Sequence, residues 1–294
     1  MSDSAGDLDL TLVAVWRAED RIMAIADSRI VRTRGNVLTE HGPKLLPITV
    51  VCKQPGPERI INKLVHRADV GFAYSGSTLS ALAAHALSSA LLSKLVGPPD
   101  APLPGLNEVA FLIAGTAAEY MREVGQLAGQ NGLFSSIVFG WCPATMRLRV
   151  FELFPEPNAA QLAVTVRERL LQPVRLGGSA SESVVVIGSS PGSLIQDIND
   201  DLNNAETRGE RHPIVAFDAP KRALRKLIAE GGDEMIGGII QQGQATSAGF
   251  EIIGQLERID PTPPSPRNAG LFILGHDIFN LRQVGNYQVL TEGR

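Results

Sequence analysis

The chain has 294 residues, 44% of them hydrophobic, and 27 Lys and Arg against 31 Asp and Glu give it a net charge of −4. This length and apolar content are enough to bury a sizeable core, so we expect an ordered globular protein. The sequence has no basic block that could neutralise a phosphate backbone and no apolar run near the ~20 residues that span a bilayer. We therefore expect a cytoplasmic protein that binds neither nucleic acid nor membrane.

The first ten residues, MSDSAGDLDL, contain three aspartates and no Lys or Arg. They lack the basic start and the long apolar core of a secretory signal. The cysteines, Cys52 and Cys142, lie far apart, and the five histidines show none of the spacings typical of zinc ligands. The sequence implies no metal and no cofactor.

Apolar and β-branched runs predict strands, and alanine-rich and leucine-rich segments predict helices. In the first half, strands are expected at 11–16, 22–26, 44–51 and 68–78, with a polar excursion at 52–63, and helices at 79–96 and 106–127. In the second half we expect a hairpin at 135–143 and 147–155, a strand, turn and helix at 183–204, a helix at 219–231 and two strands within 237–253. Runs of strands alternating with pairs of helices favour sheets covered by helical layers.

The first two predicted strands bring a hydroxyl close to a carboxylate. If their turn is centred on Glu19, Thr11 faces Asp27 across the ladder, with Cβ atoms about 4.5–5.5 Å apart. A threonine hydroxyl becomes a competent nucleophile when a base takes its proton, and the amine of the same residue can be that base at a chain terminus. Thr11 would become such a terminus only after residues 1–10 are removed.

The segment from Thr11 to "IADSR", which contains Asp27 and Arg29, resembles the start of a proteasome β-type subunit of the N-terminal-nucleophile hydrolase superfamily. Later motifs continue this resemblance in the same order over residues 11–254. They are "KLLPI" with Lys44, "GFAYSGST" with Gly76, "VVVIGSS" with Ser189, and "DEMIGG" with Asp233 and Gly237.

The resemblance implies an α+β fold, a four-layer αββα sandwich of two antiparallel sheets flanked by helices. It implies that Thr11 is the nucleophile, that Asp27 and Lys44 form a charge pair, and that Gly76 donates its N–H to an oxyanion. Ser189 and Asp233 would be hydrogen-bond partners of the terminal amine. These are the parts of a threonine protease that cleaves a peptide or other amide substrate.

The resemblance also implies a homo-oligomer, with a ring as one arrangement. Three segments follow from it: residues 1–10 as a propeptide-like extension, 11–259 as the hydrolase-like domain, and 260–294 as a Pro-rich linker and C-terminal extension. The proposed chemistry is physically sound, because a lysine near an amine disfavours the charged form of the amine and keeps it basic. A glycine N–H can face an oxyanion because no side chain blocks the approach.

Two positions depart from the family pattern. Leu10 precedes Thr11 where self-cleaving members have a small residue, and Ile236 replaces a serine. An alternative is therefore a catalytically silent subunit that serves as a structural or assembly protein.

A third hypothesis is a serine hydrolase, because "GSSPG" (188–192) fits the G-x-S-x-G pattern with Ser190 as nucleophile and His276 downstream. Pro191 argues against it, because the residue after the nucleophile must donate its N–H to the oxyanion hole. Ser189 and Ser190 also fit ordinary helix capping.

Overall fold

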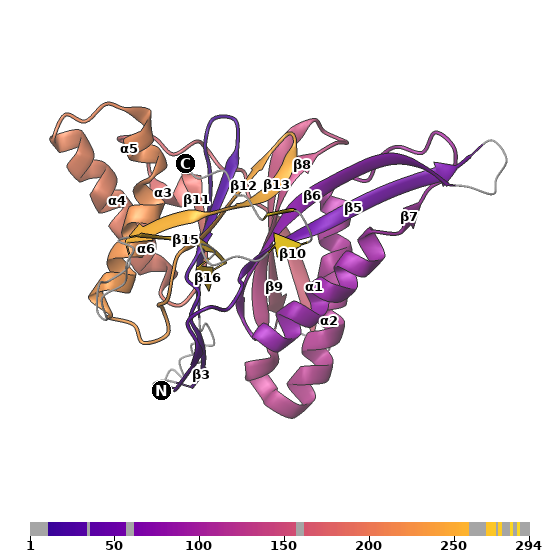
Figure 1. The fold of residues 1–294 in the computed structure, drawn as a ribbon, viewed down its shortest axis with the longest axis horizontal. Coiled ribbons are helices and arrows are strands. Elements are labelled where there is room, and N and C mark those ends of the chain that lie inside the picture. Colours follow the sequence, from indigo (N-terminus) through magenta and orange to yellow (C-terminus); the bar gives the residue numbers. More distant parts are fainter. Residues whose placement is uncertain are drawn as a thin grey trace.

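The computed structural model describes residues 11–33, 36–56, 62–156, 162–258, 269–274, 276–277, 283–284 and 287–288. In this part of the chain two β-sheets pack face to face, and helices cover the outer face of each sheet (Figure 1). The predicted α+β class and four-layer αββα sandwich are therefore confirmed.

The first sheet has the N-terminal hairpin near its centre. Its strands are β1 (Leu12–Arg17), β2 (Ile22–Ala26), β11 (Val184–Gly188), β12 (Gln241–Thr246) and β13 (Gly249–Ile253). They follow the order β11-β1-β2-β12-β13, and all neighbours are antiparallel. All of β2, and all of β1 except Arg17, is buried. The nearly unbroken apolar sequence of these two strands reflects this burial on both faces.

The second sheet has the strand order β10-β9-β8-β6-β5-β7. Its strands are β5 (Leu45–Pro55), β6 (Asn62–Gly76), β7 (Leu95–Val96), β8 (Phe134–Cys142), β9 (Arg147–Glu156) and β10 (Ala163–Glu168). Neighbours are antiparallel, except that β7 runs parallel to β5. The polar excursion predicted at 52–63 is wrong at both ends, because β5 extends to Pro55 and β6 begins at Asn62, and its middle part, 57–61, lies outside the described residues. Side chains alternate between the two faces of a strand, so a long hairpin can present polar residues to solvent while its backbone stays paired.

Each helical layer covers one sheet. α1 (Thr78–Leu92) and α2 (Leu106–Ala128) pack on the second sheet, and a 3₁₀ turn, η1 (Gly129–Gly132), follows α2. The first sheet is covered by α3 (Ala180–Ser183), α4 (Pro191–Thr207), α5 (Pro213–Phe217) and α6 (Ala219–Glu230). The four predicted helices are confirmed, although the first ends at Leu92 and not at residue 96, because the chain pairs with β5 as β7 at that point.

The core consists of three apolar layers. One lies between α1–α2 and the second sheet, and another lies between α4–α6 and the first sheet. The third joins the two sheets, where Val13 and Val15 of β1 belong to the same cluster as Ala73 and Ile137 of the second sheet. This inter-sheet layer holds the first strand against β6, and the site described below lies at its edge.

Short ribbons complete the described structure. They are β3 (Ile30–Thr33) with β4 (Asn36–Thr39), β14 (Gln255–Arg258) with β15 (Ala269–Ile273) and β16 (His276–Asp277), and β17 (Gln283–Val284) with β18 (Tyr287–Gln288). The predicted N-terminal extension at 1–10 and the Pro-rich linker at 260–268 lie outside the described residues. None of the helices in the described residues is long and apolar enough to cross a membrane.

Candidate active site

Thr11 lies directly before β1, the strand that β2 and β11 flank, and it is only 4% exposed. Its carbonyl oxygen accepts a hydrogen bond from the Ser189 backbone N–H at 2.8 Å and another from the Ser75 hydroxyl at 3.3 Å. Ser75 belongs to the second sheet, and Ser189 begins the turn between β11 and α4. Thr11 is thus fixed between the two sheets.

The register of the N-terminal hairpin differs by one residue from the predicted register. Val13 pairs with Ala26, so Asp27 stands opposite Leu12 and not opposite Thr11. The predicted turn held an odd number of residues, whereas the observed turn holds an even number, as tight hairpins commonly do. The carboxylate still reaches the start of β1, because its Oδ1 accepts the N–H of Leu12 at 2.9 Å.

Asp27 is completely buried, and its carboxylate accepts four hydrogen bonds. Besides Leu12, the backbone N–H groups of Arg29 and Gly237 donate to Oδ2, each at 3.2 Å. The fourth donor is Lys44 Nζ, which lies 2.9 Å from Oδ1. Burial raises the pKa of Asp27, and the Lys44 ammonium and the backbone donors oppose that rise.

Lys44 is as buried as its partner, since neither side chain of the ion pair is exposed to solvent. Its Nζ also donates to the carbonyl oxygen of Arg29 at 2.5 Å. Burial lowers the pKa of Lys44, and the Asp27 carboxylate opposes that fall. Because Lys44 Nζ and the Leu12 N–H both bond Asp27 Oδ1, the ammonium lies beside the backbone that follows Thr11.

Gly76 ends β6 and turns the chain toward α1 with a φ of 106°. A Cβ at this position would lie 2.7 Å from the carbonyl oxygen of Leu133. Conformation and space therefore both favour glycine here. The preceding residue, Ser75, contacts the Thr11 carbonyl, so the Gly76 turn lies close to Thr11.

Gly188 makes the close approach between β11 and Thr11 possible. Its φ is 119°, and a Cβ would lie 1.8 Å from the Thr11 carbonyl oxygen. The next residue, Ser189, is 8% exposed and donates its N–H to that same oxygen. The strand-to-turn step at "IGSS" therefore lies beside Thr11.

The rival serine-hydrolase motif has a strained serine without the expected surroundings. Ser190 has a left-handed backbone, with a φ of 51°, and occupies the N-cap position of α4. Pro191 follows it and has no N–H to donate. His276, its predicted partner, has its ring 5.2 Å from the ring of His41. Ser190 precedes α4 and accepts the N–H of Ser193 through its carbonyl oxygen at 3.0 Å, but its side chain does not make the capping hydrogen bond that the sequence suggests.

Asp233 lies in the turn that leads to Gly237. Its carboxylate accepts the N–H of Met235 at 2.9 Å, and its carbonyl oxygen accepts the N–H of Ile236 at 3.1 Å. The described contacts of its side chain thus close its own turn and do not include Thr11. Ile236 is 4% exposed and packs in the core below α4–α6. Gly237 connects this turn to the site through its N–H bond to Asp27.

Three residues that help to build the site were not predicted from the sequence. The Ser75 hydroxyl bonds Thr11, Gly188 lets β11 approach it, and the buried Gln241 accepts the backbone N–H of Lys44 at 2.9 Å. Ser75 and Gly188 directly precede two predicted residues, so adjacency was a usable signal for them. Gln241 comes from a distant strand, and no local pattern marks it.

The assembled site places a threonine next to a buried ammonium, a buried carboxylate and two glycine turns. A hydroxyl beside buried charges and glycine turns is an arrangement that can serve acyl transfer. Among the described residues, no three His, Cys, Asp or Glu side chains come together in a way that could hold a metal ion.

Two packed sheets between two helical layers form the fold of the N-terminal-nucleophile hydrolases. By sequence, the chain matches no protein-family profile and no curated protein. By structure, it is similar to solved proteins that are named Anbu.

The helical assembly of the Anbu complex from Pseudomonas aeruginosa matches with a TM-score of 0.55 and 16% identity, over 83% of this chain and 86% of that chain. Anbu (ancestral beta-subunit) from Yersinia bercovieri matches with a TM-score of 0.54 and 14% identity, over 82% and 87%. An Anbu mutant from Hyphomicrobium sp. strain MC1 matches with a TM-score of 0.52 and 16% identity, over 82% and 84%. At these identities the similarity concerns the fold.

Proposed function

We propose that the chain is a proteasome-like subunit of the N-terminal-nucleophile hydrolase superfamily that hydrolyses amide bonds, in peptides above all, through Thr11. The observation that carries this proposal is the fully buried Lys44–Asp27 ion pair, which bonds the N–H of the residue after Thr11. Burying two charges has a desolvation penalty that their attraction often fails to offset. A role in chemistry at Thr11 explains why the pair lies there.

In the proposed reaction the free amine of Thr11 takes the proton of the Thr11 hydroxyl while the oxygen attacks the amide carbon. The Gly76 N–H stabilises the oxyanion. The carbon–nitrogen bond then breaks, the leaving amine receives the proton, and an ester remains on Thr11. Water hydrolyses this ester to a carboxylic acid and restores the hydroxyl.

The charged groups of the site tune the amine in this proposal. The Lys44 ammonium disfavours a second positive charge nearby, so the amine stays unprotonated near neutral pH. Asp27 keeps Lys44 charged and in place, and Ser189, which lies beside Thr11, would bond the amine. Asp233 closes the turn that brings Gly237 to Asp27. The amine becomes free only when residues 1–10 are removed, so the full-length chain would be an inactive precursor.

The test is amide hydrolysis by the purified protein on a panel of fluorogenic peptide amides, with the variants Thr11→Ala and Thr11→Ser. We expect Thr11→Ala to lose activity by roughly a thousandfold or more, as the loss of a nucleophile does in other hydrolases, and Thr11→Ser to keep part of it. Circular dichroism should show that both variants remain folded. Unchanged activity in a folded Thr11→Ala variant would contradict the proposal.

A second candidate, a silent structural subunit, is favoured by Ile236. This residue fills an apolar core where the family pattern has a serine, so one hydroxyl partner of the amine is missing. A silent subunit would show no activity on any peptide amide, and Thr11→Ala would change nothing. Its role would then be assembly.

Assembly itself belongs to the proposal, because one structurally similar protein is described as a helical assembly. We propose a homo-oligomer in the cytoplasm, in a ring or another repeating arrangement. Sedimentation velocity should give a mass several times the 31.4 kDa of one chain. A species of 31.4 kDa at micromolar concentration would exclude a stable oligomer.

A further inference from the structure

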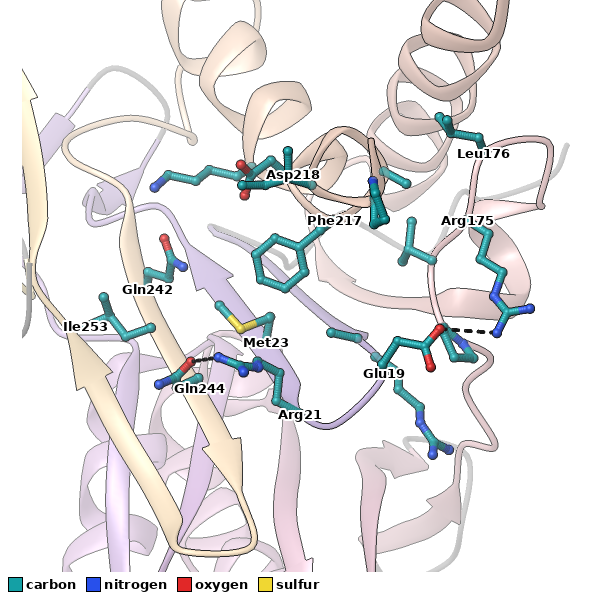
Figure 2. Close-up of a pocket in the computed structure, with 18 of the residues that line it drawn as sticks. Glu19, Arg21, Met23, Arg175, Leu176, Phe217, Asp218, Gln242, Gln244 and Ile253 are labelled. Atoms are coloured by element: carbon teal, nitrogen blue, oxygen red, sulfur yellow. Dashed lines mark hydrogen bonds and ion pairs between the residues drawn. The ribbon is translucent and has the colours of Figure 1, made fainter. Parts of the chain in front are cut away.

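A cavity of about 750 Å³ lies at the far end of β1 from Thr11. It lies where the β1–β2 turn, the segment 173–176, α5 and the start of α6 meet β12 and β13 (Figure 2). With a rise of about 3.3 Å per residue, the six residues of β1 separate it from Thr11 by about 20 Å. The cavity is therefore distinct from the site proposed for hydrolysis, and its volume is in the range of small-molecule sites.

The floor of the cavity is apolar. Met23 of β2, Phe217 at the end of α5 and Ile253 of β13 face this space (Figure 2). The ring of Trp16 packs edge-on against the ring of Phe217, with centroids 6.3 Å apart. A ligand on this floor would bury apolar surface. Because the ligand would contact Phe217, which packs against Trp16, its binding should change the fluorescence of Trp16.

One buried polar group on the floor has no partner. Gln242 is 8% exposed, and its Oε1 is buried without a hydrogen-bond partner among the described residues. By contrast, the side chain of Gln244, two residues further along β12, accepts from Arg21 at 3.2 Å and donates to Glu251 at 2.5 Å. Buried polar atoms are nearly always paired, and Gln242 points its amide into the cavity (Figure 2). The cavity thus offers an acceptor to a ligand that carries an N–H or O–H donor.

The lining of the cavity carries an excess of positive charge. Five cationic residues line the cavity against two carboxylates, Glu19 and Asp218; the cations are Arg17, Arg21, Arg175, Arg211 and Lys221. Arg21 pairs with Asp20 at 2.9 Å and Arg175 pairs with Glu19 at 3.3 Å. Arg211 is exposed and pairs with no carboxylate of the described residues, so its guanidinium is available to an anion.

We propose that this cavity binds a small carboxylic acid that has an apolar body and a hydrogen-bond donor beside it, the chemistry of an N-acylated apolar amino acid or dipeptide. The apolar body lies on Met23 and Phe217, the donor bonds Gln242 Oε1, and the carboxylate lies at the mouth near Arg211. The ligand thus covers the apolar floor, and its donor and its carboxylate each bond a group that has no partner among the described residues.

The test uses Trp16 as a fluorescent reporter in the full chain. The protein has two tryptophans, and Trp141→Phe leaves only Trp16. N-acetyl-Phe-Leu is titrated into this protein, in parallel with two matched probes: its C-terminal amide, which lacks the carboxylate, and decanoate, which lacks the donor. We expect saturable binding of N-acetyl-Phe-Leu and at least about tenfold weaker binding of each of the other two, as for the loss of a charged or a buried hydrogen bond.

Two variants locate the binding, each with a matched control on the exposed surface of α2. Gln242→Leu is compared with Gln126→Leu, and Arg211→Gln is compared with Arg122→Gln. The cavity variants should each weaken binding of N-acetyl-Phe-Leu by about tenfold, and the controls should leave it within about twofold.

The proposal is overturned if N-acetyl-Phe-Leu does not bind, if it binds no better than its amide and decanoate, or if Gln242→Leu binds it as well as Gln126→Leu does. The signal comes from Trp16 beside the cavity, so the measurement reports binding there and not amide hydrolysis at Thr11. Failure here would leave the role of Thr11 untouched, and failure of the Thr11 proposal would leave this site untouched.

Discussion

At the level of single residues, the proposed chemistry at Thr11 explains the Lys44–Asp27 pair better than stability does. Neither side chain is exposed, and each bonds backbone groups in addition to its partner. Buried ion pairs add little net stability compared with apolar residues of similar size, but removing one partner leaves an uncompensated charge. The fold therefore depends on both members being present together.

We expect Lys44→Met to lower the free energy of unfolding by about 3–5 kcal/mol at pH 7, because the Asp27 carboxylate then stays buried without a positive partner. The double variant Asp27→Asn with Lys44→Met should recover a large part of that loss. Urea denaturation at a fixed temperature measures both. Lys63→Met, at an exposed position of β6, is the control and should stay within about 0.5 kcal/mol of the parent.

The loss of stability caused by Lys44→Met should also depend on pH. Burial raises the pKa of Asp27, and without Lys44 the main group opposing that rise is gone. A carboxyl whose pKa is higher in the folded than in the unfolded state stabilises the fold below its unfolded pKa, and this contribution is lost as pH rises. The free energy of unfolding of the variant should therefore be closest to that of the parent near pH 4, and the difference between them should grow as pH rises. A loss that is the same at pH 4 and pH 7 would contradict this account.

At the scale of elements, the chain reaches Thr11 through turns that require glycine. Gly188 ends β11 with a φ of 119°, and the Thr11 carbonyl oxygen occupies the place of its missing side chain. By contrast, Gly115 of α2 is exposed and has no atom within 4 Å of the position of a Cβ. The same substitution should therefore have opposite effects at these two positions.

We expect Gly188→Ala to destabilise the fold by at least about 2 kcal/mol, from the steric clash and the positive φ together. Gly115→Ala should stabilise it by about 0.5–1 kcal/mol, because alanine is the better residue in a helix interior. Thermal and urea denaturation of the two variants provide the comparison. A Gly188→Ala variant as stable as the parent would show that β11 does not hold Thr11 as closely as described.

Secondary structure with a strong local pattern could be predicted, whereas features fixed by pairing could not. Apolar runs and alanine-rich segments located the N-terminal hairpin and four helices. The hairpin register was wrong by one residue because the number of turn residues decides it. The extended β5–β6 hairpin and β10 were not predicted, because their polar residues resemble a loop until a partner strand satisfies the backbone.

At the scale of the whole molecule, the sandwich brings distant segments to one point. Thr11 meets Ser75 from the second sheet, Ser189 from the β11–α4 turn and, through Asp27, Gly237 from the segment before β12. Sequence motifs marked most of these segments but could not show which atoms meet. The inter-sheet layer determines that, since it packs β1 against β6.

Intact-mass spectrometry of the purified full chain shows whether Thr11 acquires the free amine that its proposed chemistry needs. We expect the active wild-type protein to lack residues 1–10 and to begin at Thr11. A wild-type protein that hydrolyses peptide amides at full length would contradict a role for the Thr11 amine.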